Sequence, residues 1–555
     1  MIKTIKLKFG RGIGSTPEEI ATTPVTVFVG PNNSGKSKAL TEIHRYCSTG
    51  QRNTANVIVE SIEFDEFTTD IAEEKIKKVT LQPNHNEALL PDHIIIGKRG
   101  TRNHIPRHDL INTFLSTNSR PQQFCQWYLA SNTIILDGRS RINLIGQQTA
   151  GDLQQPHQAS FQVLFLDDVK REEVRRILHD AFGTYFVIDP TNIGHLRLRL
   201  ASRPPATPRE ERGIDDEAVK FHAQAFPVEQ ASDGVKAFTG IITEIIAGDP
   251  AIILIDEPEA FLHPSLSFKL GKEIASSSAG SEKRLFVSTH SPNFVMGCIQ
   301  SRVPVNIVRL TYRGEVATAR ILSNKDILRL MRNPLLRSTG VLGGLFYEFV
   351  VVTESDSDRA FYQEINERLL SHKPELGIPN CLFLNAQNKQ TVHIIIKPLR
   401  ELGIPAVGIV DVDILKDGGQ EWTKFLKGGF IPELEHQSLG GLRSAVNQKI
   451  KDTGLDMKKG GIDILSGSDK EAANNLFEKL AEYGLFVVRK GELESWLSSL
   501  GASGHGSNWL IDIFGKMGED PELANYLKPS DDDVWLFCGE IKKWFTNPNR
   551  KGIPS

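Results

Sequence analysis

The sequence predicts an α/β protein whose sheets are mostly parallel. Short apolar runs alternate with helical patterns after about residue 225 and again after about residue 339, and such alternation is typical of parallel sheets covered by helices. The chain has 555 residues, which is more than one hydrophobic core usually organises and predicts two to four domains. We therefore expect a first domain at 1–338, with an irregular or dimerisation insert at about 50–225, and a second domain with a C-terminal extension at 339–555.

The composition limits the class of protein. Hydrophobic residues make up 39% and charged residues 24% of the chain, as in soluble globular proteins, which argues against disorder. The formal charge of -3 means that any binding to DNA or RNA would need a local basic surface. The five cysteines form no CxxC pair, which suits a reducing cytoplasm. Apolar runs fall short of the ~20 residues that cross a bilayer, and Lys3, Lys6 and Lys8 lie where a signal peptide would be apolar. We expect a cytoplasmic protein with no membrane partner.

In the first half of the chain, the sequence pattern predicts several individual strands and helices. Alternation of Ile5, Leu7 and Phe9 with lysines predicts a half-buried strand. The sequence further predicts strands at 25–29, 57–62, 133–136, 251–255 and 285–288, and helices at 170–182, at 235–246 and from Pro264 onward. Prolines and charged residues at 202–217 predict an exposed loop or linker.

A phosphate-binding loop follows the strand at 25–29. Residues 30–37 read GPNNSGKS, the GxxxxGKS pattern of a P-loop between a strand and a helix. Its backbone N–H groups would surround the phosphates of ATP, the lysine would reach the β and γ oxygens, and the last serine would bind Mg²⁺. The predicted nucleotide contacts are Gly30, Asn32, Asn33, Ser34, Gly35, Lys36 and Ser37.

Two carboxylates end the apolar strand at 251–255. Asp256 would hold Mg²⁺ with Ser37, and Glu257 would act as the base that polarises the water attacking the γ-phosphate. Together with the P-loop, these residues predict an ATPase.

The order of these motifs resembles that of the ABC-type ATPases of the structural-maintenance and RecF-like group. Ser232-Asp233-Gly234 lies where that family has its signature, with aspartate at the second position, and residues 261–264 lie where it has its D-loop. His290 is similar to the switch histidine that senses the γ-phosphate. For the Q-loop glutamine, Gln147 and Gln148 are candidates. The resemblance implies a head-to-head homodimer or higher homo-oligomer, in which Ser232 contacts the ATP of the partner subunit.

The second domain repeats the strand and helix alternation. We predict strands at 349–353, 381–384, 406–410 and 484–488, and helices at 357–370, 392–402, 468–483 and 492–500. Glu354 follows the first of these strands and Asp358 comes four residues later, while Asp411 and Asp413 follow the third. If the strand continues, period two places these last two aspartates on one side. Carboxylates at neighbouring strand ends predict a Mg²⁺ or Mn²⁺ site.

This arrangement of acids resembles the Toprim domain. An ABC-like ATPase followed by a Toprim domain is the layout of the OLD (overcoming lysogenization defect) nucleases, whereas topoisomerases and primases fit less well. The resemblance implies that Glu492 and Glu494 help to bind a second metal ion, and that a lysine, Lys490 or Lys389, lies near the scissile phosphate. Two ions would then activate water and stabilise the leaving 3′ oxygen of a DNA phosphodiester.

The sequence therefore predicts an ATP-regulated, metal-dependent DNA endonuclease. Basic residues at 197–212 and 542–551 are candidate DNA contacts. OLD-like proteins occur in anti-phage systems of the Gabija, retron and PARIS types, which implies a helicase, a retron reverse transcriptase with its RNA–DNA, or a second subunit as a partner. The alternatives are a non-cleaving, ATP-switched sensor or scaffold with a degenerate Toprim domain, and a RecF-like repair ATPase.

Overall fold

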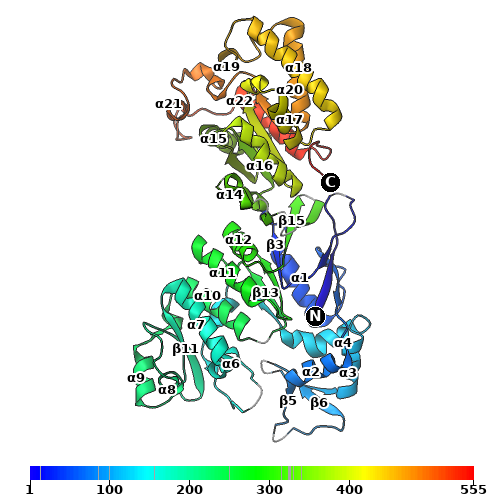
Figure 1. Ribbon diagram of the computed structural model, residues 1–555, viewed down its shortest axis with the longest axis vertical. Coiled ribbons are helices and arrows are strands. Elements are labelled where there is room, and N and C mark those ends of the chain that lie inside the picture. Colours follow the sequence, from blue (N-terminus) through cyan, green and yellow to red (C-terminus); the bar gives the residue numbers. More distant parts are fainter. Residues whose placement is uncertain are drawn as a thin grey trace. The chain divides into compact units, whose positions relative to one another are not determined.

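The chain divides into two compact units. The computed structural model describes residues 1–12, 14–84, 87–98, 101–154, 157–248, 250–313, 316–322, 327–328, 331–338 and 340–554. The first unit is Met1–Ile327 and the second is Leu328–Ser555 (Figure 1). The predicted boundary after residue 338 therefore lies inside the second unit.

The first unit is organised around a mainly parallel sheet. Its strands lie in the order β16-β15-β3-β14-β13-β8, and all neighbours pair in parallel except β15 and β16. This confirms the predicted α/β class, and the strands predicted at 25–29 and 133–136 have the same bounds in the structure. The strands are β3 (Val25–Val29), β8 (Thr133–Leu136), β13 (Ile252–Asp256), β14 (Arg284–Ser288), β15 (Val305–Arg313) and β16 (Val316–Leu322).

Helix α1 (Lys36–Thr49) follows β3 after a short loop and packs against this sheet. Its apolar residues Ala39, Leu40 and Ile43 share a core with Phe28 and Leu254 of the strands. The same core takes in a small antiparallel sheet with the order β2-β1-β4, formed by Glu19–Ala21, Ile2–Leu7 and Val59–Phe64. The other helices that position the site are α10 (Asp233–Ile246), α11 (Pro264–Ser277) and α12 (Pro292–Gln300).

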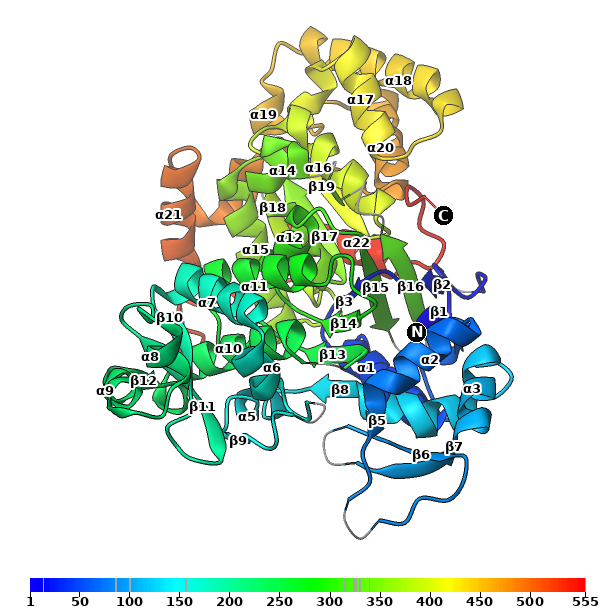
Figure 2. The ribbon, with the colours of Figure 1, turned by 60° about the horizontal axis from the view of Figure 1, so that its bottom comes forward.

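Apart from strands such as β4 and β8, which belong to the sheets described above, much of the segment between α1 and α10 forms two lobes of the first unit. Figures 1 and 2 both show one lobe around α2, α3 and β5–β7, and another around α6–α9 with β10 and β11. The first lobe contains α2 (Thr69–Val79), β5 (Thr80–Leu81), β6 (His93–Ile96), β7 (Asn103–Pro106) and α3 (Arg107–Leu115). The second contains α6 (Ser160–Leu166), α7 (Asp168–Phe182), β10 (Tyr185–Asp189), β11 (His195–Ala201), α8 (Pro208–Arg212) and α9 (Asp216–Gln224).

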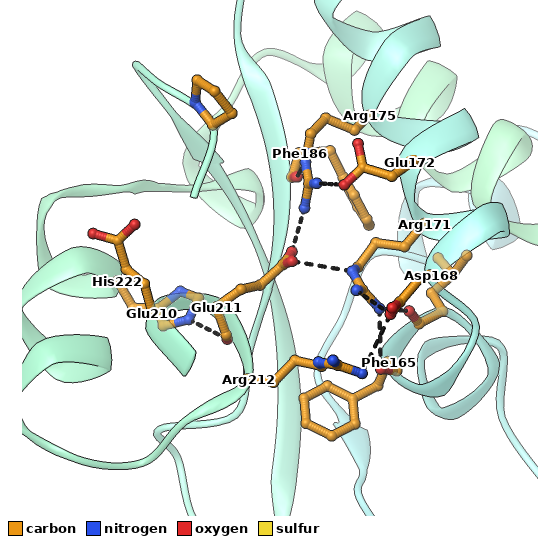
Figure 3. A network of polar contacts seen from close by, with 12 residues as sticks. Phe165, Asp168, Arg171, Glu172, Arg175, Phe186, Glu210, Glu211, Arg212 and His222 are labelled. Carbon is orange, nitrogen blue, oxygen red and sulfur yellow. Dashed lines mark hydrogen bonds and ion pairs between the residues drawn. The ribbon is translucent and has the colours of Figure 1, made fainter. Parts of the chain in front are cut away.

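The segment predicted as an exposed loop or linker at 202–217 is mostly exposed, but its middle forms the short helix α8, which a buried ion-pair network docks. Glu211 is 3% exposed and lies between two arginines of α7, with Arg171 at 3.1 Å and Arg175 also in contact (Figure 3). His222 of α9 contacts the Glu211 carbonyl oxygen at 2.8 Å. Burial of these charges is sustained because each has an oppositely charged partner.

The basic stretch at 197–212 is largely neutralised. Arg197 and Arg199 both pair with the fully buried Asp189, at 2.7 and 2.6 Å. The remaining pairs are Arg203 with Glu210, Arg209 with Asp215 and Arg212 with Asp168. The arginines form one run in the sequence, whereas their acidic partners come from several elements. The positive charge expected on this surface is therefore largely paired.

The second unit contains a parallel sheet with the order β18-β17-β19-β20. These strands are β17 (Phe349–Thr353), β18 (Cys381–Asn385), β19 (Ala406–Asp411) and β20 (Leu485–Val488). Residues of α15 (Asp356–His372), α21 (Ser507–Met517) and α22 (Asp533–Thr546) share a core with one face of the sheet. Helix α16 (Lys389–Glu401) packs close to Gly408 of β19, where a Cβ atom would lie 2.5 Å from Ile396 Cδ1.

Between β19 and β20 the chain forms several helices. They are α17 (Gly419–Gly428), α18 (Glu433–Asp452), α19 (Met457–Gly460) and α20 (Gly467–Glu482). The helix predicted at 492–500 is wrong: the structure has 3-10 turns at Leu493–Ser495 and Ser498–Leu500, separated by Leu497 with a φ of 50°. No helix in the described part of the chain is both long and apolar enough to cross a membrane.

Candidate functional site

The loop between β3 and α1 is shaped to hold an anion. Positive φ angles at Gly30, Asn33 and Gly35 curl its backbone, and a Cβ atom on Gly30 would lie 2.0 Å from the Leu310 carbonyl oxygen, so only glycine fits there. The buried Ser34 hydroxyl has no hydrogen-bond partner among the described residues. A phosphate oxygen at the loop would satisfy it, which fits the predicted ATP site.

Lys36 lies inside this loop. Its Nζ donates hydrogen bonds to the carbonyl oxygens of Gly30 at 2.9 Å and Pro31 at 2.7 Å. Burial lowers the pKa of Lys36 to about 8, although the nearby carboxylates of Glu257 and Asp256 oppose the shift. An ammonium group held by its own loop is available to bind incoming phosphate.

The two predicted magnesium ligands of the ATPase unit lie together. The Ser37 hydroxyl donates to Asp256 Oδ1 at 2.8 Å. The Ser288 hydroxyl, at the end of the neighbouring strand β14, donates to the same carboxylate. A carboxylate with a serine hydroxyl beside a phosphate loop is a suitable oxygen donor set for Mg²⁺.

Glu257 and His290 also come together. Glu257 leaves β13 with a φ of 50°, and its Oε1 lies 3.4 Å from His290 Nε2. Burial and the positive charge of Lys36 lower the pKa of His290, against the opposing charge of Glu257. The predicted base and the predicted γ-phosphate sensor therefore flank one position next to the P-loop.

Two further residues of this site were not predicted from the sequence. Glu259 accepts a hydrogen bond from the His290 backbone N–H at 2.7 Å, and burial raises the pKa of its carboxyl group. Arg141 donates to the carbonyl oxygens of Asp256, at 2.9 Å, and Glu257. Glu259 stands only two positions after Glu257, so its place in the site could have been predicted from the sequence. Arg141 is 115 positions from Asp256 and belongs to no motif.

The predicted signature begins a helix next to the predicted D-loop. Ser232 is exposed and directly precedes α10. A Cβ atom on Gly234 would lie 2.6 Å from the Phe261 carbonyl oxygen, so the two segments are in contact. Of the Q-loop candidates, Gln147 accepts a hydrogen bond from Asn192, and Gln148 bonds to Ser160 and Phe161.

In the second unit, Glu354 and Asp411 meet where neighbouring strands β17 and β19 end. The Asp411 backbone N–H donates to Glu354 Oε1 at 2.8 Å. Burial raises the pKa of both carboxyl groups far above their ordinary range, and the charge of each adjacent acid adds to the shift. This position is the point where the strand order reverses, which is where ligands bind in open α/β sheets.

Asp358 lies one turn into α15 and caps it. Its Oδ2 accepts hydrogen bonds from the Ser355 backbone N–H at 3.0 Å and from the Ser355 hydroxyl. Burial raises the pKa of Asp358, and the charge of Glu494 contributes in the same direction. Among the described residues no cationic side chain forms an ion pair with Glu354, Asp358 or Asp411, and the charge of Asp358 helps to raise the pKa values of both Glu354 and Asp411.

The outer acids have lysine partners. Lys389, at the start of α16, lies 2.8 Å from Asp413 Oδ1, and Lys458 of α19 lies 3.1 Å from Glu492 Oε2 and 3.6 Å from Asp413 Oδ2. Burial alone would lower the pKa of Lys458, but its hydrogen bond to Glu492 and the charge of Asp413 raise it overall. Asp413 belongs to a 3-10 turn at Val412–Lys416, so the expectation that a continuing strand aligns it with Asp411 is wrong.

The remaining predicted residues lie beyond β20. Lys490 contacts Asp533 at 2.6 Å and the Trp496 ring, whose centroid is 5.8 Å away. Glu494 Oε1 lies 2.6 Å from His505 Nδ1. Glu492, Glu494 and His505 can each place one ligand atom within 4.8 Å of the others. Of the two lysine candidates, Lys389 therefore contacts the acids, whereas sequence reasoning missed Lys458 and His505.

Comparison with known proteins supports an ATPase domain in the first unit. Residues 163–296 match the family described as "AAA domain, putative AbiEii toxin, Type IV TA system". No curated protein matches the chain.

Similar solved structures include the SmcHead bound to the C-winged helix domain of ScpA, with 17% identity over 59% of this chain and 99% of that chain and a TM-score of 0.33. They also include the SMC head domain from Thermotoga maritima, with 12% identity over 58% and 99% of the two chains and a TM-score of 0.27. The Smc head domain from Pyrococcus furiosus, bound to the C-terminal domain of ScpA, has 12% identity over 60% and 98% and a TM-score of 0.30. Together, the family match and the geometry of the P-loop show that the chain carries an ATPase domain in an α/β fold.

Proposed function

We propose that the protein is an ATP-regulated, divalent-metal-dependent DNA endonuclease. The first unit binds and hydrolyses ATP, and the second hydrolyses phosphodiester bonds. The observation that carries the nuclease half is the meeting of Glu354 with Asp411 at the reversal point of the second sheet. Buried acids without cationic partners are costly, and a bound divalent ion offsets that cost.

For ATP hydrolysis, we assign a separate role to each residue of the site in the first unit. The P-loop backbone and Lys36 bind the phosphates, while Ser37 and Asp256 hold Mg²⁺. Glu257 accepts the proton of the attacking water, and His290 lies beside it to contact the γ-phosphate. Ser232, exposed at the start of α10, contacts the nucleotide of a second copy in the proposed homodimer.

For DNA hydrolysis, Glu354, Asp358 and Asp411 form the inner metal site, and Asp413, Glu492 and Glu494 extend it. Bound Mg²⁺ or Mn²⁺ would supply activated water and stabilise the leaving oxygen. Lys389 and Lys458 neutralise the outer acids and can donate hydrogen bonds to a phosphate group. The role in anti-phage defence, with a helicase, a retron reverse transcriptase or a second subunit as partner, is part of the same proposal.

The direct test is nicking of plasmid DNA with Mg²⁺ or Mn²⁺, with and without ATP. Glu354→Gln and Asp411→Asn should each lower nicking by about 100-fold or more, because each removes an inner metal ligand. Asp356→Asn is the matched control, since Asp356 lies exposed at the start of α15, two residues after Glu354, and pairs with Arg359. Nicking by the wild type that survives both ligand substitutions would contradict the nuclease assignment.

One observation favours the non-cleaving, ATP-switched alternative. Lys389 and Lys458 already pair with Asp413 and Glu492, so part of the acid cluster is balanced without a metal ion. A protein that hydrolyses ATP but neither nicks DNA nor binds Mn²⁺ through Asp411 would be such a switch.

A further inference from the structure

A buried arginine holds the end of β13, the strand that carries Asp256. Arg141 lies in the short helix α5 (Ser140–Asn143), just after β8, and is only 2% exposed. Its guanidinium donates to the carbonyl oxygens of Asp256, at 2.9 Å, and Glu257. These are the two residues to which we assign magnesium binding and proton acceptance.

The backbone at this point needs support. Glu257 has a φ of 50°, a left-handed conformation that costs a residue with a side chain about 1 kcal/mol or more. Its own N–H donates to the Ser288 carbonyl oxygen at 2.9 Å, and Arg141 holds its carbonyl on the other side. The peptide groups around Glu257 are thus fixed from both directions, which sets where its carboxylate points.

Arg141 also connects this turn to the predicted D-loop and signature helix. Its guanidinium lies 5.9 Å from the centroid of the exposed Phe261 ring. A Cβ atom on Gly240 of α10 would lie 2.6 Å from the Arg141 carbonyl oxygen, so the helix packs directly on the arginine backbone. One residue therefore contacts three segments that border the ATP site.

Arg141 carries its charge into a buried position beside the acids of the ATP site. Among the described residues it has no ion pair, and its buried Nε has no hydrogen-bond partner. Burial lowers the pKa of Arg141, and the charges of Glu259, Glu257, Asp256 and Asp137 oppose the shift. A buried cation without a direct ionic partner is costly, and such costs are commonly found at functional sites.

We propose that Arg141 is a positioning residue for ATP hydrolysis, which fixes the Asp256–Glu257 turn so that the Glu257 carboxylate faces the attacking water. This inference rests on the proposed ATPase activity. It assigns Arg141 no contact with nucleotide, so its loss should affect turnover far more than nucleotide binding.

The test compares Arg141→Met and Arg141→Lys with Arg139→Met in the full chain. Arg139 is the matched control because it is exposed two positions earlier in the same turn. Steady-state hydrolysis gives kcat and KM, and calorimetry gives the Kd of ATP. We expect Arg141→Met to lower kcat by about 10–100-fold, since small misplacements of catalytic groups have effects of that size, with the ATP Kd changed less than about threefold. Arg141→Lys keeps one donor and should recover part of the kcat.

Three results would overturn the inference. An unchanged kcat in Arg141→Met, with an active wild type, would refute the inference alone. A parallel loss of ATP binding and of Tm in both Arg141 variants would show that the arginine only holds the domain together. A wild-type protein that binds but does not hydrolyse ATP would refute the proposed ATPase activity, and the inference with it.

Discussion

At the scale of single residues, the fold of the second unit brings Glu354 into contact with Asp411. Both are largely buried, and the only direct bond between them runs from the Asp411 backbone to the Glu354 carboxylate. Ionising both would place two negative charges close together in a medium of low dielectric constant. Without a metal ion, they therefore keep protons at a pH at which ordinary carboxyl groups have lost them.

This protonation predicts a pH dependence of stability. In the unfolded chain these carboxyl groups lose their protons near pH 4, whereas the folded metal-free protein retains them to higher pH because burial raises both pKa values. The folded state then binds more protons than the unfolded state, so its stability falls as the pH rises through this window. We expect the Tm in EDTA to decrease from about pH 5.5 to about pH 8.5, and Asp411→Asn to flatten that decrease.

The control for this prediction is the metal ion. Mn²⁺ favours the ionised carboxylates, so it should raise the Tm of the wild type most at the alkaline end and that of Asp411→Asn little. Differential scanning fluorimetry across the pH series measures both effects. Parallel curves for wild type and variant would show that the two acids do not titrate as a buried pair.

At the scale of elements, the second lobe of the first unit depends on Glu211. Its carboxylate joins α8 to Arg171 and Arg175 of α7 (Figure 3), and α7 packs in turn on α10. Glu211→Gln removes the buried carboxylate, while Arg171 and Arg175 keep their exposed partners Asp168 and Glu172. We therefore expect a cost below the about 3–5 kcal/mol of a buried charge left without any partner. We expect faster hydrogen–deuterium exchange in α7 and α8.

The neighbouring Glu210→Gln is the control for this change. Glu210 is also buried, but its partner Arg203 is half exposed, so we expect breaking this pair to cost less than breaking the fully buried pairs of Glu211. Equal exchange in the two variants would mean that apolar packing, and not the buried charges, holds α8 in place.

The elements that could be predicted are those with a local cause. The strands at Val25–Val29 and Phe349–Thr353 are continuous apolar runs that end in turn residues, so their bounds follow from the sequence. The helix α8 could not be predicted, because prolines and charges at 202–217 have the pattern of a loop, and only the long-range pairing of Glu211 with α7 makes the segment dock. The helix predicted at 492–500 fails because of the left-handed Leu497.

At the scale of the whole molecule, each site combines local motifs with residues from distant segments. The P-loop, Asp256–Glu257 and the acids after β17 and β19 each follow a strand, which makes them visible in the sequence. Arg141 and Lys458 each lie in a short helix without a motif, α5 and α19. Their roles depend on where the chain returns after an insert or a set of helices. Long-range contacts of this kind leave no periodic pattern to detect.

The proposed function also requires that the two units communicate, and Lys36→Ala tests this. The substitution removes the ammonium group that we propose binds phosphate in the first unit and leaves Glu354, Asp358 and Asp411 of the second unit intact. If ATP regulates DNA cleavage, nicking by the wild type changes when ATP is added, whereas nicking by Lys36→Ala should stay at its ATP-free rate, within about twofold. Asp411→Asn should show the reverse, with ATP hydrolysis retained and nicking lost. A Lys36→Ala protein that still responds to ATP would place the regulatory nucleotide elsewhere, because thermodynamic coupling requires that the effector bind at the site from which it acts.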